Sequence, residues 1–356
     1  MKKFKLSKTL KSSLLTYGLV IFAYVLMQIL ISGGHVSSLM QGLLVPLCVY
    51  AILAVSLNLT VGILGELSLG HAGFMCVGAF ASAFFSKCVQ DSIENSFIRF
   101  TLAIMIGALA AGAAGIIIGI PVLRLKGDYL AIVTLAFGEI IKNLVNILYV
   151  GKDESGFHIS FKSSLDLNMS PNGVQIIKGA QGITGTPNDS TFTIGIVLLL
   201  ITLFIVLNLI HSRDGRAIMA IRDNVIAAES VGINITKYKL MAFSVSAALA
   251  GVAGVLYAHN ISTLTALPKN FGYNMSILIL VFVVLGGIGN IRGSIISAVV
   301  LTLLPELLRG LNNYRMLIYA VVLIVMMLFN WAPACIGWRE KIFGGLRKKK
   351  NTKEAA

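Results

Sequence analysis

Charged residues are scarce in this chain of 356 residues. Asp, Glu, Lys and Arg make up 12% of it, about half of the ~25% that is usual in soluble domains. Apolar residues make up 56%, and a water-soluble fold could not cover so much apolar surface with so few charges. Four Cys and seven Pro, with no short glycine period, exclude disulfide-scaffold and collagen-like chains. The composition predicts an all-α fold, that of a polytopic helical membrane protein.

Sequence motifs for catalysis or for nucleotide and metal binding are absent as well. There is no G-x-x-x-x-G-K-[ST] phosphate loop, no H-E-x-x-H, no C-x-x-C and no G-x-S-x-G. The four cysteines, Cys48, Cys76, Cys88 and Cys335, have no metal-ligand spacing. We therefore predict no catalytic residues, no metal and no cofactor. Any energy from a nucleotide must come from another chain.

Apolar segments of about twenty residues can cross the ~30 Å hydrocarbon core of a bilayer. Six segments are clear: 13–32, 98–121, 129–150, 192–210, 239–258 and 315–333. The first of them has no convincing cleavage site after it and is interpreted as an uncleaved span. Two longer regions, 39–87 and 274–308, are broken by glycines around 62–70 and 286–293. Two passes in each region give ten spans, and eight spans with re-entrant segments is the alternative.

The net charge of +14 is concentrated in runs beside the apolar spans. Such runs normally set topology and anchor the chain to anionic headgroups, so we expect the lipid bilayer as a partner and no nucleic acid. A cytoplasmic N-terminus places 20 of the 29 Lys and Arg inside. The predicted parts are a basic cytoplasmic N-terminus (1–12), a permease domain (13–335) with an extracytoplasmic loop (151–191) and a cytoplasmic loop (211–238), and a basic cytoplasmic tail (336–356).

The two glycine-broken regions form a weak parallel repeat, because each runs inward, breaks and returns. Interrupted helices are one signature of transporters, since unwound backbone leaves N–H and C=O groups free to line a polar path. Close helix packing is the alternative role for the glycines. An ionisable residue inside a span is a further candidate. The pathway candidates are Asn58, Gly65, Glu66, Ser68, His71, Glu139, Gly286, Gly287 and Gly289.

Three acidic residues in or near the spans have structural interpretations that compete with a role in the path. Lys142 lies one turn after Glu139, so an i,i+3 ion pair would neutralise both charges. Glu306 has Arg309 at the same spacing. Glu66 has no basic residue close in sequence, and either lines the path or faces the cytoplasm.

The most informative polar stretch is 214–232. Asp214 is expected to cap one helix, Asp223 or Asn224 a second one, and Gly232 suits the position after a helix end. Val225 and Ile226 stand among charges, which indicates a short helix with apolar surface to bury. That surface fits either a groove of another protein or the lipid headgroup layer.

This stretch resembles the loop by which permeases of ATP-binding-cassette (ABC) importers dock their ATPases, in Ala227-Ala228-Glu229 to Gly232. The surrounding run 215–257 is similar to the branched-chain amino-acid permeases, specifically their M-type subunit. Four further stretches agree in the family's order: 56–74, 127–135, 182–187, and 284–289 with 304–306. Together they cover roughly residues 40–335. The chain departs from the family at 179–181, where Gly-Ala-Gln replaces a frequent Gly-Gly.

The resemblance implies half of the translocation pore of an importer for leucine, isoleucine and valine. The implied partners are a homologous permease subunit, two cytoplasmic ATPase subunits and an extracytoplasmic solute-binding protein. The implied location is the bacterial inner membrane, with both termini cytoplasmic. The implied docking residues are Gly215, Arg216, Arg222, Ala227, Ala228, Glu229 and Gly232.

Two other functions remain open at this point. One is an ABC permease for urea or another small polar solute. The other is an ion-coupled carrier that uses Glu66, His71 and Glu139 as proton sites.

Overall fold

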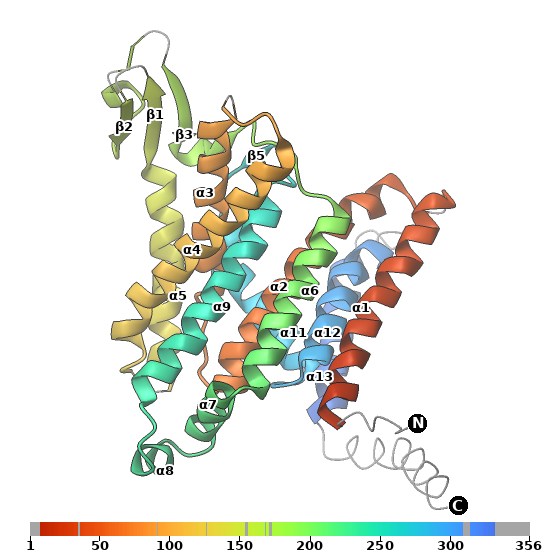
Figure 1. Cartoon of the computed structure of the whole chain (residues 1–356). Helices are drawn as coiled ribbons and strands as arrows, with labels where there is room; N and C mark the ends of the chain where they lie inside the picture. The colour runs from red at the N-terminus through yellow and green to blue at the C-terminus, as the bar shows by residue number, and fades with distance from the viewer. Residues whose placement is uncertain are drawn as a thin grey trace, which may run out of the picture.

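The computed structural model describes residues 8–331, except 35, 91, 126, 154–155, 168, 171–172 and 309–313. Long helices lie side by side, with a small sheet at one end and two short helices at the other (Figure 1). The long helices are α1 (Lys8–Ser32), α2 (Ser38–Asn58), α3 (His71–Val89), α4 (Ser96–Val122), α5 (Asp128–Ile147), α6 (Phe192–His211), α9 (Ile235–Ala258), α11 (Tyr273–Gly286), α12 (Ile291–Leu307) and α13 (Arg315–Trp331).

These helices coincide with the ten predicted spans. Eight helical stretches in the described part of the chain are long and apolar enough to cross a membrane, α11 being joined there by the short α10 (Pro268–Phe271). The other two, α12 and α13, have 17 residues each, the lower end of the spanning range. The chain is therefore a multi-pass helical membrane protein, as its composition predicts.

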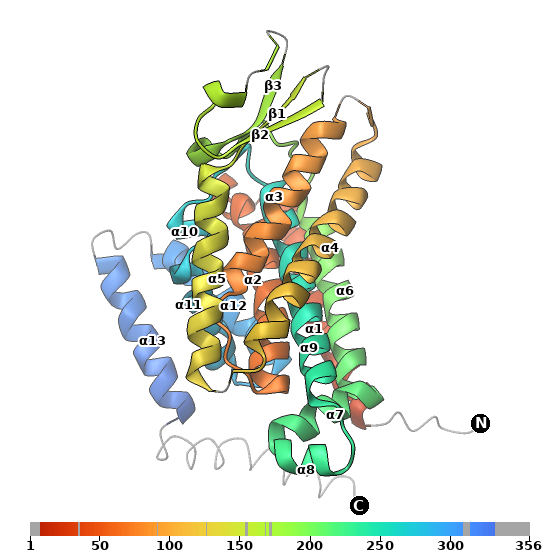
Figure 2. The ribbon, with the colours of Figure 1, turned by 90° about the vertical axis from the view of Figure 1, so that its left-hand side faces the viewer.

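The short helices α7 (Arg213–Asp223) and α8 (Val225–Ser230) occupy one end of the bundle. The first turns of α1 and the last turns of α13 lie at that same end (Figures 1 and 2). At the opposite end, β1 (Tyr149–Asp153), β2 (Gly156–Ser160) and β3 (Val174–Lys178) form an antiparallel sheet of order β2-β1-β3. Below it, β4 (Ile183–Thr184) pairs with β5 (Thr263–Leu264). The sequence did not predict these strands, which are a minor addition to the helical fold.

Glycines let three helices of the bundle approach closely. In α4, a Cβ added to Gly115 would lie 2.6 Å from the Cβ of Ala247 in α9. A Cβ added to Gly119 would lie 2.7 Å from Leu240 on the same helix. In α3, Gly78 contacts the backbone of Gly251 in α9. Small residues at such contacts replace side-chain packing with backbone packing, as is common between membrane helices.

Candidate translocation path and docking loop

The first glycine break starts where α2 passes into a π-helical turn, Leu59–Leu64. Such turns are rare and often occur at functional sites. The helix then ends at Gly65, whose φ of +81° is easy for glycine and costly for residues with a Cβ. Residues 65–70 carry no helix, and α3 begins at His71. The interruption expected from the sequence is therefore a real break of six residues.

Polar side chains from three other helices contact the broken segment. Thr134 of α5 accepts a hydrogen bond from the N–H of Leu69 at 3.0 Å, and Ser276 of α11 accepts one from the N–H of Ala72 at 3.1 Å. Thr60 donates to Ser246 of α9 at 2.8 Å. Thr134 and Ser276 thus satisfy backbone N–H groups at the break, which water cannot reach inside a membrane.

Two of the predicted pathway residues are buried here, Ser68 in the break and His71 at the start of α3. His71 is buried, and its Nε2 lies 2.7 Å from the hydroxyl of Ser56. The hydroxyl of Ser68 is also buried and has no hydrogen-bond partner among the described residues. His71 is therefore held by α2, whereas Ser68 keeps a hydroxyl that is not used within the described chain.

The second break separates α11 from α12. Gly287 and Gly289 both have positive φ, +93° and +80°. Asn290 caps the new helix by accepting from the N–H of Gly293 at 3.3 Å. Gly286 packs directly against the backbone of Gly293, with no room for a side chain on either residue. Both predicted breaks thus exist and both rest on glycine.

The two breaks contact each other through Asn58, at the end of α2. Its Nδ2 donates to the hydroxyl of Ser294 at 2.9 Å, and its Oδ1 accepts from the N–H of Gly289 at 2.9 Å. A Cβ on Gly62 would lie 2.7 Å from the Cα of Gly289. Asn58 therefore uses both halves of its carboxamide to join segments about 230 residues apart in the sequence.

Two basic residues contact the first break, one from the loop between α6 and α9 and one from the first turns of α9. The Nη1 of Arg222, at the end of α7, donates to the carbonyl oxygen of Gly62 at 3.0 Å. A Cβ on Gly65 would lie 2.6 Å from the Cγ of Arg222. Lys239, in the first turns of α9, forms an ion pair with Glu66. Glu66 thus has a basic partner that its sequence neighbourhood does not show.

The surface of this loop is carried mainly by α8. Ile226 and Val231 are 80% and 74% exposed, and Ala227 and Glu229 are exposed beside them. Arg216 on α7 is exposed as well. By contrast, Ala228 is buried at 3% exposure, and Gly215 is buried against the end of α6. Among the predicted docking residues, the exposed ones are thus available to another chain, whereas Ala228 and Gly215 shape the loop itself.

The caps of the two short helices match the prediction in part. Asn224 caps α8 by accepting from the N–H of Ala227 at 3.0 Å, and Gly232 follows the helix with a φ of +81°. The predicted cap of α7 is wrong. Ser212 accepts from the N–H of Gly215 at 3.0 Å, and Asp214 lies inside the first turn. The serine is two residues earlier, where the chain leaves α6, and it therefore holds the cap position.

Glu139 makes the ion pair that its spacing predicts. It pairs with Lys142 in α5, and its Oε1 also accepts from the N–H of Tyr273 at 2.9 Å, at the start of α11. The carboxylate therefore connects α5 to α11 as well as neutralising the lysine. For Glu306, the proposed partner Arg309 lies outside the described residues.

The segment before α6 is held at the sheet end of the bundle by residues that the sequence did not single out. Arg99, buried at the start of α4, pairs with Asp189 at 2.9 Å. Lys87 of α3 donates to the carbonyl oxygen of Gly185 at 3.1 Å. Arg99 is the one basic residue within 98–121, and that isolation is the signal that could have identified it.

Comparison with known proteins identifies a family to which the chain is similar. Residues 39–329 match the model of the family described as branched-chain amino acid transport system, permease component. The high-affinity branched-chain amino acid transport system permease protein LivM of Salmonella typhimurium is 35% identical over 294 residues, 80% of this chain and 67% of LivM. The related permease protein LivH of the same organism is 24% identical over 71% of this chain and 79% of LivH.

The fructose import permease protein FruG of Bifidobacterium longum is similar to a smaller part of the chain, 24% identical over 51% of it and 55% of FruG. No solved structure matches the chain significantly.

Proposed function

Because this chain belongs to the family of permease components of branched-chain amino acid transport systems, we propose that it forms half of the translocation pore of an ATP-driven importer for leucine, isoleucine and valine. A homologous permease subunit completes the pore. Two ATPase subunits bind on the side of α7 and α8, and a solute-binding protein delivers substrate on the side of the β2-β1-β3 sheet. The chain lies in a bacterial inner membrane with the docking loop (211–238) and both termini in the cytoplasm.

One observation carries this proposal. The docking loop contacts the first glycine break, and the first break contacts the second. Arg222 binds the carbonyl oxygen of Gly62, and Asn58, one turn earlier, binds Gly289 and Ser294. A displacement of α7 therefore acts on both interrupted helix pairs through three hydrogen bonds. Domain closure commonly turns on short hinge segments that absorb large backbone changes, and the glycines at 62–65 and 286–289 supply such segments.

The chemistry of the substrate suits a path of this kind. Branched aliphatic side chains need no hydrogen bonds in transit, whereas the ammonium and carboxylate groups do. Backbone groups at the two breaks supply polar contacts of moderate strength, as does the hydroxyl of Ser68, which has no partner among the described residues. Moderate contacts favour release into the cytoplasm, and they leave selectivity to the protein that delivers the substrate.

The docking assignment is tested by changing the charge of exposed residues on α8. In vesicles containing the complete importer, Ile226→Asp and Glu229→Lys should each release the ATPases and abolish ATP-dependent leucine uptake, because a buried contact would receive an unpaired or reversed charge. Co-purification of the ATPases and uptake of labelled leucine are the two measurements. The matched control is Leu165→Asp, an equally exposed apolar residue at the sheet end, which should leave ATPase binding unchanged.

Two results would contradict the proposal. One is full ATP-dependent uptake in both α8 variants. The other is uphill accumulation of leucine by this polypeptide alone under a proton gradient, which would make it an ion-coupled carrier. Uptake of urea but not of leucine by the complete importer would keep the docking assignment and change the substrate.

A further inference from the structure

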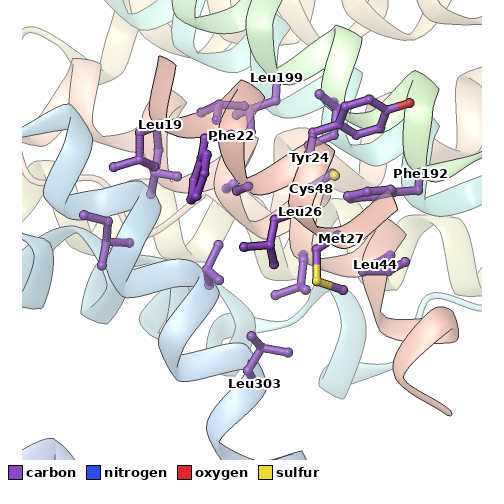
Figure 3. Close-up of a pocket in the computed structure, with 18 of the residues that line it drawn as sticks. Leu19, Phe22, Tyr24, Leu26, Met27, Leu44, Cys48, Phe192, Leu199 and Leu303 are labelled. Atoms are coloured by element: carbon purple, nitrogen blue, oxygen red, sulfur yellow. The ribbon is translucent and has the colours of Figure 1, made fainter. Parts of the chain in front are cut away.

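A deep apolar groove lies between α1, α2, α6 and α12, and no residue of either glycine break lines it. Its volume is about 430 Å³. Figure 3 shows that side chains from all four helices line it, among them Leu19, Phe22, Met27, Cys48 and Leu303. The lining side chains carry only carbon and sulfur, apart from the hydroxyl of Tyr24, which is hydrogen bonded to Thr193 at 3.1 Å. The lining therefore favours an apolar ligand.

The groove is about as deep as one leaflet of a bilayer. It begins at the sheet end of the bundle, at Met40 in the first turn of α2 and Phe192 in the first turn of α6. It ends at Ala51 of α2. Eleven residues of helix separate Met40 from Ala51, about 16 Å at 1.5 Å per residue. Half of the ~30 Å hydrocarbon core is about 15 Å.

A hydrogen bond closes the inner end of the groove. The Nε of Arg292, at the start of α12, donates to the hydroxyl of Thr16 in α1 at 2.6 Å. Leu19 and Ile295, the lining residues nearest to that bond, each lie one turn further along their helices. The two walls, α1 and α12, are thus joined just below the floor of the groove and remain open above it.

From this shape we propose that the groove binds one acyl chain of a phospholipid from the leaflet on the side of the β2-β1-β3 sheet. A transmembrane helix of a neighbouring subunit would have to continue through the membrane, where the Arg292–Thr16 bond joins the walls. A flexible hydrocarbon chain enters at the interface and ends at mid-membrane, as the groove does. An unfilled groove would leave its lining without contact partners, which is unfavourable. This site does not depend on the transported solute or on the proposed function.

Photolabelling of the full-length protein in its native complex tests the proposal. The probe is a phosphatidylethanolamine with a diazirine at the end of one acyl chain, added in trace amount to nanodiscs. Cys48 and Ala51 line the groove and are otherwise buried, at 3% and 1% exposure, so a probe reaches them only through the groove. We expect labelled peptides from this part of α2. A diazirine placed near the headgroup should shift the label toward Met40 and Phe192.

A filling variant provides the control. Ala23 lines the groove from α1, and Val25 on the same helix is exposed but lies outside the lining. Ala23→Phe should lower labelling of α2 several-fold, whereas Val25→Phe should leave it unchanged. The proposal is overturned if α2 is not labelled, if both variants label it equally, or if the groove crosslinks to another polypeptide in place of lipid.

Discussion

At the scale of single residues, Asn58 connects more distant parts of the chain than any other pathway candidate. Replacing it with leucine keeps its size but leaves the N–H of Gly289 without its acceptor. The hydroxyl of Ser294 loses the donor Asn58 and keeps only its bond to the carbonyl oxygen of Asn290. A buried polar group without a partner costs about 1–3 kcal/mol. We expect Asn58→Leu to lower the thermal midpoint of the purified complex and to reduce leucine uptake, measured by scanning fluorimetry and by vesicle transport.

A double-mutant cycle separates this contact from general damage. Ser294→Ala removes one of the two hydrogen bonds, so its effect alone should be smaller than that of Asn58→Leu. In the Asn58→Leu background it should add little, because residues in one hydrogen-bonded network are not additive. Fully additive effects of the two substitutions would show that Asn58 and Ser294 do not act as a pair.

The ion pair of Glu66 with Lys239 gives a prediction about the path. Both side chains are largely buried, at 15% and 11% exposure. Removing one partner leaves an uncompensated charge, whereas removing both is often tolerated. Lys239→Met alone should therefore destabilise the complex, and adding Glu66→Gln should restore its thermal midpoint and leucine uptake. A stable double variant that cannot transport would instead place Glu66 in contact with the substrate.

The ionisable candidates show what a sequence can and cannot tell about such residues. The free-energy cost of placing an ionisable side chain inside a membrane was enough to single out Glu66, His71 and Glu139. The partner of Glu139 was predictable because Lys142 lies one turn away. The partners of Glu66 and His71 were not. Lys239 is 173 residues from Glu66 in the sequence, and Ser56 meets His71 only because the chain turns back between α2 and α3. Their place in the path stays a prediction.

At the scale of elements, α2 and the π-helical turn that follows it contain two glycines with different surroundings. Gly42, near the start of α2, has no described residue within 4 Å of an added Cβ, whereas Gly62, in the π-helical turn, packs against Gly289. We expect Gly42→Ala to be neutral or to stabilise by about 0.5–1 kcal/mol, the usual gain of Ala over Gly in a helix. Gly62→Ala should lower both the thermal midpoint and uptake, because the methyl group separates the two breaks.

Equal behaviour of the two variants would contradict the close approach of the breaks. The same assays of thermal midpoint and uptake apply to both, and Gly42→Ala shows how the assays respond to a harmless glycine substitution in the same segment. A Gly62→Ala complex that folds normally but transports slowly would assign the contact to conformational change rather than to stability.

The helices and the breaks between them could be predicted from the sequence, because local sequence pattern determines both. Apolar length located the helices, and clustered glycines located both breaks, because glycine is favoured where a helix ends with positive φ. The sheet at the end of α5 was missed, although Phe157, His158, Ile159 and Ser160 alternate in polarity. That alternation covers one short strand, and its pairing with β1 and β3 is not visible locally. The contact between the two breaks is also a tertiary contact, and local sequence does not show it.

At the scale of the whole molecule, the arrangement of its two ends gives a prediction about orientation. The docking loop and the ends of α1 and α13 share one side, and the sheet lies on the other (Figure 2). Arg213, Arg216, Arg222 and Lys237 cluster on the loop side, and positive residues are retained in the cytoplasm. Single cysteines in a background without native cysteines report this directly. Ser164→Cys, on the sheet side, should react with a membrane-impermeant maleimide in spheroplasts.

Ser230→Cys, on the docking loop, should react only after the membrane is permeabilised. Both serines are exposed, so a difference in labelling reflects the side of the membrane rather than burial. The reverse pattern would place the docking loop outside the cell, where no ATP-driven subunit could bind it. In that arrangement the contact of Arg222 with the first break could not transmit the ATPase cycle, and the proposed function would fail together with the predicted topology.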